Sequence, residues 1–478
     1  MKPRSLALAL GTALWGVALT GLAGPPAGDK LNVLFLMADD LRPELGCYGA
    51  GHVISPNIDR LAKRGRMFKH AYCQQALCNP SRASMLTGLR PDSLGIWNLP
   101  THLRQRRPDI VTLPQHFRNN GYFTECVGKI FHNWRQDIHG DPQSWSVPQF
   151  MHYARHDDDK PRVEGKPPGN EIKLPRSTIR DVPDEAYFDG RIATRAIESL
   201  RGLKKKNRKP FFLAVGFWKP HLPFNAPKRY WNLYDPAKVK LPESLAKPAN
   251  GPDIALHDSR ELLRAFGGRK PSPRDIRELR RGYYAATTYM DAQVGRVLDE
   301  LDQLGLRDST IVVFTGDHGF HLGEHSLWCK TSNYEWDAAV PLIITPPHLG
   351  KRGEASPSPV ELLDLYPTLA ELCGLAKPTH LEGASLVPAL KDPVAEVKPF
   401  AITQHPRPAY YTGKEPEVMG YSLRTRHHRY TEWRNWRTGE VVARELYDHQ
   451  NDPGENKNVA AESARWVQVL SRKLAKIH

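Results

Sequence analysis

A short stretch near residue 80 combines a thiol, a proline and an arginine at a spacing that suits nucleophilic chemistry. Residues 78–88 read Cys-Asn-Pro-Ser-Arg-Ala-Ser-Met-Leu-Thr-Gly. Pro80 fits the first turn of a helix, where its missing N–H costs nothing, and Gly88 would end that helix. Cys78 would lie just before the helix N-terminus, which favours negative charge, and Arg82 adds a planar cation suited to tetrahedral oxyanions. The segment therefore predicts a nucleophile that meets an oxyanion, with a buried inert cysteine as the alternative.

Polar side chains follow four predicted strands. The clusters are Asp39 with Asp40, Lys129 with His132, His221, and Asp317 with His318, and they follow the strands predicted over 32–37, 122–127, 211–217 and 310–315. Taken singly, each cluster could be a turn or a core residue. Because open α/β sheets bind ligands at the carboxyl ends of their strands, we expect the clusters to meet there. Converging carboxylates bind a cation or shift their pKa values, and oxygen ligands suit Ca²⁺ or Mg²⁺.

The elements that position these side chains alternate between strand and helix up to about residue 390. Besides the strands above, strands are predicted over 67–72 and 340–345, and helices over 56–64 with Ser55 as cap, 113–120, 186–203, 275–304 and 360–372. This alternation predicts an α/β sandwich around a largely parallel sheet. Residues 135–183 lack periodicity and are expected to form an irregular insertion at the substrate mouth. Short aromatic and basic strands after about residue 393, such as 421–425 and 428–433, predict a small antiparallel domain that ends in a helix.

The composition limits the partners. The chain of 478 residues has a formal net charge of +15, which attracts polyanions such as nucleic acid, anionic lipid or sulfated polysaccharide. There is no zinc-finger spacing, no RNP-type aromatic motif and no long Lys/Arg tract, so we expect no nucleic-acid partner. The charge is compatible with an acidic substrate, and a solvated basic surface without a function is the alternative.

The N-terminus is typical of a secretory signal peptide over residues 1–23. Lys2 and Arg4 precede an apolar stretch over 6–22, and Gly21-Leu22-Ala23 is a small-x-small cleavage pattern. A single membrane anchor is the alternative, but the small residues that follow favour cleavage. We therefore expect a secreted or periplasmic protein with no stable membrane insertion after signal cleavage. Six cysteines are too few for a disulfide scaffold, and their spacing defines no pairing.

These motifs resemble the type I sulfatases, which depend on formylglycine. The segments that carry the resemblance are, in order, 31–34, 39–43, 55–59, 78–88, 127–132, 219–221, 316–319 and 322–330, with 445–448 and 452–455 near the C-terminus. Gln74-Gln75 ahead of the thiol, and His318 where arylsulfatases commonly have Asn, most resemble the iduronate-2-sulfatase branch. The resemblance implies an alkaline-phosphatase-like sandwich with a large mixed, mostly parallel sheet between helices, and a small C-terminal domain with an antiparallel sheet. The expected division is a catalytic domain over 29–392 and a C-terminal subdomain over 393–478.

The resemblance also implies roles for the site residues. Cys78 would be converted by a formylglycine-generating maturase to Cα-formylglycine, whose aldehyde hydrate is the nucleophile. One Ca²⁺ ion would be held by Asp39, Asp40, Cys78, Asp317 and His318. Arg82 and Lys129 would hold the hydrate and the developing charge, and His221 and Lys330 would grip the sulfate and help protonate the leaving alcohol. Asp317 would take the proton of the attacking hydroxyl, and His132 that of the second hydroxyl, so that sulfate leaves.

The sequence thus predicts an exported sulfatase that hydrolyses sulfate esters of a sugar. The expected sugar is a 2-O-sulfated uronic acid or a related residue, in saccharides from a sulfated glycan. Two alternatives stay open. One is a phosphonate or phosphodiester hydrolase of the same fold, and the other is a non-catalytic relative that binds polyanions.

Overall fold

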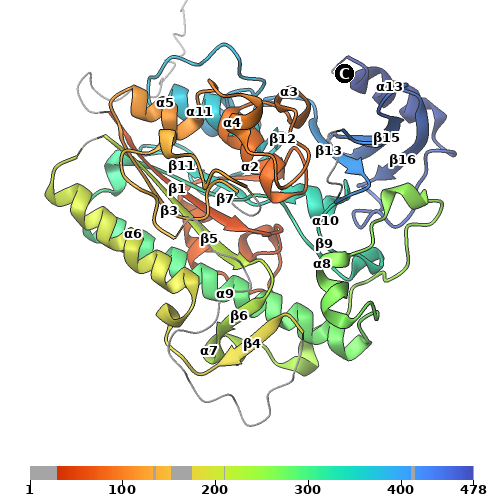
Figure 1. Ribbon diagram of the computed structural model, residues 1–478, viewed down its shortest axis with the longest axis horizontal. Helices are drawn as coiled ribbons and strands as arrows, with labels where there is room; N and C mark the ends of the chain where they lie inside the picture. Colours follow the sequence, from red (N-terminus) through yellow and green to blue (C-terminus); the bar gives the residue numbers. More distant parts are fainter. Residues whose placement is uncertain (1–29, 133–135, 152–174, 209, 411–414, 477–478) are drawn as a thin grey trace, which may run out of the picture.

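The computed structural model describes residues 30–132, 136–151, 175–208, 210–410 and 415–476. An eight-stranded sheet runs through the centre in the order β10-β2-β11-β7-β1-β5-β3, with β12 paired to β2 (Figure 1). Its strands are β1 Asn32–Asp39, β2 Arg66–Tyr72, β3 Phe123–Gly128, β5 Phe211–Pro220, β7 Thr310–Gly316, β10 Ala339–Val340, β11 Leu342–Thr345 and β12 Ala355–Glu361. The strands β7, β1, β5 and β3 are mutually parallel, whereas β11 runs antiparallel to β7 and β2. The sheet is therefore mixed and mostly parallel, as predicted.

Helices cover both faces of this sheet (Figure 1). One layer consists of α2 Cys78–Thr87, α5 Leu113–Asn119 and α11 Leu365–Leu372, and the other of α1 Pro56–Arg64, α6 Phe188–Lys205 and α9 Pro273–Gln303. Along β1, Val33, Phe35 and Met37 pack into the first layer, and the residues between them pack into the second. Because successive side chains of a strand point to opposite faces, a continuous apolar run such as β1 serves both layers.

Shorter elements connect these layers. They are α3 Pro91–Leu94, α4 Leu103–Arg106, β4 Ser177–Arg180, β6 Phe224–Pro227, α7 Lys228–Trp231, α8 Arg260–Leu263, β8 His321–Leu322, β9 Trp328–Cys329, α10 Glu335–Ala338 and α12 Val387–Lys391. Within the predicted insertion, the described residues contain the strand β4 and one 3-10 turn over Pro142–Ser144.

The C-terminal region forms a separate antiparallel sheet in the order β13-β14-β15-β16 (Figure 1). Its elements are β13 Ala401–Arg407, β14 Val418–Arg424, β15 His428–Asn435, β16 Val441–Asp448 and the helix α13 Ala464–Leu474. The predicted small antiparallel domain with a final helix is thus present.

Some local predictions differ from the structure in detail. The helix predicted over 360–372 begins only at Leu365, because Val360 and Glu361 pair with β2 as the end of β12. Ser55 is the N-cap residue of α1, as predicted, but its side chain makes no capping hydrogen bond, since its Oγ donates to Asp59 one turn into the helix. The first N–H groups of α1 are bound instead by the carboxylate of Asp291 on α9, which lies far away in the sequence.

No helix within the described ranges is long and apolar enough to cross a membrane. The predicted signal peptide over 1–23 lies outside the described residues.

Candidate active site

The predicted polar clusters converge because four neighbouring parallel strands end side by side. In sheet order, β7, β1, β5 and β3 lead directly into Asp317, Asp39, His221 and Lys129. All four side chains are buried. The carboxyl edge of the sheet therefore carries a buried polar centre, at the position expected for ligands of an open α/β sheet.

The helix α2 brings the thiol to this centre. It begins at Cys78 itself, one residue earlier than predicted, and all ten of its residues are buried. Asn79 Nδ2 anchors the first turn by donating to the carbonyls of Asn98 and Thr101, both at 2.8 Å. Gly88 ends the helix in the left-handed conformation, at φ 71°, as predicted for a C-terminal glycine.

Arg82 joins three strand ends. Its Nη2 donates to Asp39 Oδ1 and its Nε to Asp317 Oδ2, both at 2.8 Å, while Nη1 donates to the carbonyls of Lys129 and Ile130. These bonds use four of the five N–H donors of a guanidinium. Burial opposes the charge, but Asp317 and Asp39 outweigh it and raise the pKa of Arg82. Arg82 is therefore a fixed cation with one N–H left over for a ligand.

Lys129 reaches the centre because β3 and β5 approach closely at two glycines. Its Nζ lies 2.6 Å from Asp39 Oδ2, and its backbone N–H donates to the Gly216 carbonyl. A Cβ on Gly216 would lie 1.9 Å from the Lys129 carbonyl oxygen, and one on Gly128 would lie 2.1 Å from the Gly216 oxygen. Neither position has room for a side chain, so the glycines permit the approach.

Asp40 adopts a backbone conformation that is unusual for a residue with a Cβ. Its φ is +61°, and its N–H donates to Asp317 Oδ1 at 3.0 Å. The hydroxyl of Tyr283 on α9 donates to the Asp40 carbonyl at 2.8 Å and accepts from the N–H of Arg42 at 3.1 Å. Such strain persists only where surrounding contacts hold it, and it concentrates at functional sites. Tyr283 supports the site and was missed, because it lies on a helix remote in sequence.

Lys330 contacts a different set of residues from Arg82, and we call this set the Lys330 side of the centre. Its Nζ lies 2.9 Å from Asp40 Oδ2, 3.1 Å from His221 Nε2 and 2.9 Å from Glu261 Oε2. His221 Nδ1 faces the carbonyl of Leu222 and therefore carries the proton, so Nε2 accepts from Lys330. Glu261 on α8 was not predicted, since one acidic residue in a short stretch of charged and apolar residues gives no signal of its own.

His318 presents one ring nitrogen to the centre. Its Nδ1 lies 2.9 Å from the carbonyl of Gly319, and its Nε2 lies 3.3 Å from Asp40 Oδ1 and 3.4 Å from Cys78 Sγ. Nδ1 must carry the proton to bond a carbonyl, so the Nε2 lone pair faces Asp40 and Cys78. Burial and the nearby Lys330 lower the pKa of His318, which keeps the imidazole neutral and able to bind a metal.

Asp317 is already fully engaged. Its Oδ1 accepts from the N–H groups of Asp40 and His318, and its Oδ2 accepts from Arg82. Burial alone would raise its pKa, but the Arg82 cation holds it well below the usual range. Asp317 is therefore a firm anion, and it is poorly suited to the predicted role of taking a proton unless Arg82 releases Oδ2.

The thiol of Cys78 is not activated as it stands. The residue is 3% exposed, and burial, together with Asp39 and Asp317, raises the pKa of the thiol against the opposing effect of Lys129. Catalytic cysteines depend on a lowered pKa. An unmodified Cys78 is therefore a neutral, poor nucleophile.

The donor set around Cys78 fits a divalent cation. Ligand atoms of Asp39, Asp40, Cys78 and His221 lie within 4.8 Å of one another, and so do those of Cys78, Asp317 and His318. Burial and the carboxylates of Asp39, Glu261 and Asp317 raise the pKa of Asp40 despite Lys330. Burial is the largest cause of that shift, so a bound cation would stabilise the Asp40 anion, and carboxylate oxygens are the ligands of hard cations.

The remaining predicted residue, His132, is buried three residues beyond Lys129. Its role as a proton acceptor stays a prediction.

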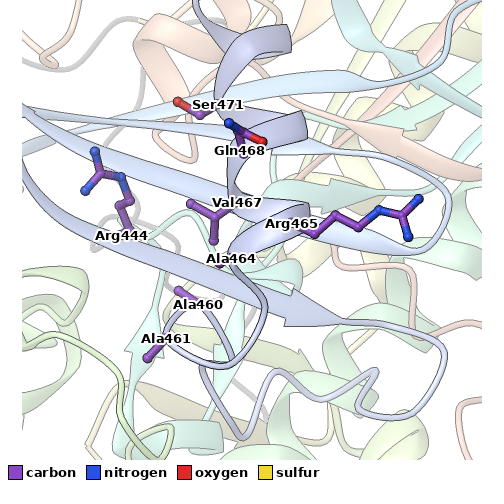
Figure 2. Close-up of a pocket in the computed structure, with 8 residues that line it drawn as sticks. All are labelled: Arg444, Ala460, Ala461, Ala464, Arg465, Val467, Gln468 and Ser471. Atoms are coloured by element: carbon purple, nitrogen blue, oxygen red, sulfur yellow. The ribbon is translucent and has the colours of Figure 1, made fainter.

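A groove elsewhere in the molecule lacks comparable chemistry. Figure 2 shows it in the C-terminal region, where it has a volume of about 740 Å³. Its lining residues are Arg444, Ala460, Ala461, Ala464, Arg465, Val467, Gln468 and Ser471. None of these eight residues is a carboxylate, histidine or cysteine, so this groove lacks the metal ligands and the thiol that gather at the strand ends.

Comparison with known proteins defines the class. Residues 31–375 match the sulfatase family model, and residues 323–478 match the model described as N-sulphoglucosamine sulphohydrolase, C-terminal. The chain belongs to the sulfatase family and is a sulfuric ester hydrolase.

Within the family, the chain falls with the iduronate-2-sulfatase branch, as its motifs predicted. It is 35% identical to iduronate 2-sulfatase of Homo sapiens over 508 aligned residues, which cover 91% of this chain and 92% of that protein. It is 30% identical to a sulfatase of Formosa agariphila, over 90% of this chain and 83% of that protein.

Solved structures show the same fold. A protein in complex with its substrate D-glucosamine-2-N,6-O-disulfate has a TM-score of 0.74 and 24% identity, over 94% of this chain and 97% of the other. A phosphonate monoester hydrolase from Silicibacter pomeroyi has a TM-score of 0.76 and 25% identity, over 94% and 95%. The predicted sandwich with a separate small antiparallel sheet is thereby confirmed.

Proposed function

We propose that this protein is an exported, calcium-dependent sulfatase that removes sulfate from a 2-O-sulfated uronic acid or a related sugar of a sulfated glycan. The observation that carries the proposal is the position of Cys78. It starts a buried helix among three carboxylates and three cations, in a chain 35% identical to iduronate 2-sulfatase.

The neutral, buried thiol supports modification of Cys78 to formylglycine by a maturase. A thiol of raised pKa attacks weakly, whereas an aldehyde hydrate supplies two hydroxyl groups at the same carbon. The helix N-terminus and Arg82, with its remaining N–H, favour negative charge next to that carbon.

Asp39, Asp40, Asp317 and His318 would hold the calcium ion, together with an oxygen of the modified Cys78. When bound, the ion neutralises the sulfate and makes the hydrate oxygen a better nucleophile. The lone pair of His318 Nε2 faces Cys78 and Asp40, which supports its inclusion among the ligands.

The reaction then needs two steps. A hydrate hydroxyl would give its proton to Asp317, once Arg82 releases Oδ2, and its oxygen would attack the sulfur. As the bond from sulfur to the sugar oxygen breaks, that oxygen would take a proton from Lys330, which lies beside His221. Arg82 and Lys129 stabilise the charge on the sulfate oxygens. The second hydroxyl gives its proton to His132, the carbon–oxygen bond to sulfate breaks, and the aldehyde re-forms. A plain thiol has no second hydroxyl and cannot complete this cycle.

The test is the mass of the peptide that contains Cys78, in protein co-expressed with a formylglycine-generating enzyme. Conversion lowers the mass by about 18 Da, and a hydrazide captures the aldehyde if it is hydrated. The modified protein should release sulfate from 2-O-sulfated uronic acid disaccharides, and a Cys78→Ala variant should not. An unmodified thiol in the presence of a competent maturase, with turnover intact, would contradict the proposed nucleophile.

One observation favours a second candidate. The likeness to the phosphonate monoester hydrolase structure covers nearly the whole chain, and that protein shares the fold. A higher kcat/KM on phenyl phosphonate monoesters than on any sulfate ester would establish this alternative. The non-catalytic alternative is set aside, because the family membership makes the chain a hydrolase.

A further inference from the structure

Glu261 touches the Lys330 side of the centre and belongs to none of the motifs that predicted the site. It lies on α8, its side chain is 18% exposed, and its Oε1 lies 3.3 Å from His221 Nε2. Its Oε2 lies 2.9 Å from Lys330 Nζ and accepts from the hydroxyl of Tyr410 at 3.3 Å. We propose that Glu261 is a positioning residue that holds Lys330 in place to stabilise the leaving oxygen of the substrate. This inference rests on the proposed function.

The role of Glu261 follows from the three hydrogen bonds that Lys330 makes. An ammonium group has three N–H donors, and Lys330 directs them to Asp40, Glu261 and His221. Lys330 therefore reaches a substrate only if one of these bonds is released. Asp40 belongs to the ligand set around Cys78, so its oxygens would also bind the cation. Glu261 does not belong to that set. Glu261 is thus the carboxylate that continues to hold Lys330 while a substrate is bound.

The backbone around Glu261 is fixed relative to Lys330. Ser259, just before α8, has φ +49°, and its Oγ accepts from the N–H of Trp328 on β9 at 3.0 Å. The strand β9 ends one residue before Lys330. Upstream, Arg407 on β13 donates to the carbonyls of Ile254 and Ala255, both at 2.7 Å. Glu261 and Lys330 therefore stand on two segments that are bonded to each other, which suits precise placement.

The side on which Glu261 acts follows from the other contacts of the centre. Arg82 and Lys129 bond Asp39, next to the attacking carbon, whereas Lys330 is bonded to Asp40, His221 and Glu261. A group that holds Lys330 affects the bond to the leaving alcohol. Its loss must therefore harm substrates with poor leaving groups more than activated ones.

The experiment compares leaving groups of rising pKa: 4-nitrophenyl sulfate, phenyl sulfate and a 2-O-sulfated monosaccharide. The aldehyde-containing wild type is compared with Glu261→Ala, Glu261→Gln and Tyr410→Phe. We expect Glu261→Ala to lower kcat about 100-fold on the sugar sulfate and less than about threefold on 4-nitrophenyl sulfate. Glu261→Gln keeps an acceptor oxygen and should fall between. Tyr410→Phe removes only the hydroxyl that bonds Glu261 and should cost about threefold on the sugar sulfate.

The matched control is Glu198→Gln, the same change at a carboxylate that is 59% exposed on α6. It should leave the dependence on the leaving group unchanged. Affinity for inorganic sulfate, measured by calorimetry, should stay within about threefold in every variant, since Glu261 acts on the leaving side. The isosteric Glu261→Gln keeps the test valid if Glu261→Ala folds poorly.

Equal losses on all three leaving groups, or a loss of sulfate affinity with an unchanged dependence on the leaving group, would overturn the proposal and make Glu261 structural. Failure of the proposed function looks different, because the wild type itself would then be inert towards sulfate esters. In that case the same comparison is made with phosphonate monoesters of the same alcohols, and it decides the role of Glu261 in the same way.

Discussion

Two clusters of charge in this molecule, one buried and one partly buried, resemble each other in composition and differ in the balance of positive and negative charge. One is the active centre. The other, which we name the interdomain cluster, consists of Glu335, Arg424, Arg429, His449 and Glu455, and it joins α10 to the C-terminal sheet. Ligand atoms of Glu335, His449 and Glu455 also lie within 4.8 Å of one another, so distance alone would allow a metal in either cluster.

The pKa shifts separate the two clusters. Burial would raise the pKa of Glu335 and of Glu455, but Arg424 and Arg429 lower the first, and Arg429 and His449 lower the second. In the active centre, burial and three neighbouring carboxylates raise the pKa of Asp40 in spite of Lys330. The interdomain cluster has two carboxylates for two arginines. The active centre has four carboxylates, Asp39, Asp40, Glu261 and Asp317, for the three cations Arg82, Lys129 and Lys330, so one negative charge is left for a cation. Buried charge marks a functional site when the protein does not balance it.

Removal of the metal should affect only the active centre, and this is the largest effect we expect. Dialysis against EGTA should lower turnover by about 1,000-fold or more and lower Tm by several degrees, since an ion that binds the native state stabilises it. Added Ca²⁺ should restore both. The variant His449→Gln, in the interdomain cluster, should show the same response to EGTA as the wild type. Turnover that persists after chelation would contradict the expected difference in metal binding between the two clusters.

A charge deletion in the interdomain cluster should reduce stability without affecting the chemistry. Arg429 bonds Glu455 at 2.6 Å and also pairs with Glu335. Arg429→Gln leaves the buried Glu455 and the half-buried Glu335 without this partner, and we expect a loss of about 3 kcal/mol in the free energy of unfolding. Urea unfolding measures it, with kcat of the folded protein expected within about twofold of the wild type.

Its control is Arg60→Gln, which breaks the exposed pair with Asp299. That change should cost about 0.5 kcal/mol or less. An equal cost for the two variants would show that the interdomain cluster contributes no more than a surface pair.

Tyr283→Phe should have a smaller effect, and one confined to the active centre. The change removes the hydroxyl that bonds both Asp40 and Arg42, so it should cost about 1–2 kcal/mol of stability and lower kcat about fivefold. Tyr284→Phe is the control, since that hydroxyl makes one long contact of 3.4 Å to Glu44. If both variants keep full kcat, the Tyr283 hydroxyl does not help to hold Asp40 in a productive conformation.

The smallest effect concerns pH and His70, which lies near the interdomain cluster and is affected by its Arg424, Glu335 and His449. Burial, with help from Arg424, lowers the pKa of His70 on β2 from 6.5 to about 4. The unfolded chain therefore binds a proton at a higher pH than the native chain does, so this group costs stability as the pH falls from about 6.5 to about 4. His70→Gln should flatten that part of the profile of unfolding free energy against pH. Parallel profiles for variant and wild type would contradict the assignment.

The sequence contained enough to predict the centre, because its signals are local. Apolar runs ending in Asp39, Lys129, His221 and Asp317 identify parallel strands and their carboxyl ends, and neighbouring strands bring those ends together. The proline and the glycine that bound α2 likewise depend only on local backbone chemistry.

The features that the sequence did not reveal depend on contacts between distant segments. Asp291 binds the first N–H groups of α1, although Ser55 matched the local capping pattern better. Tyr283 and Glu261 lie on helices whose own patterns carry no catalytic signal. The strand β12 takes residues 360–361 from a helical pattern because β2 offers a pairing edge, which tertiary structure alone creates.

The complete burial of α2 also limits when Cys78 can be modified during folding of the chain. Its ten residues pack between the sheet and neighbouring helices, and the Cys78 side chain is almost inaccessible once they do. Any enzyme that converts Cys78 must reach it before this packing is complete. The yield of modified protein then depends on the rate of conversion relative to the rate of folding. Conditions that slow folding during expression should therefore increase the fraction of modified protein.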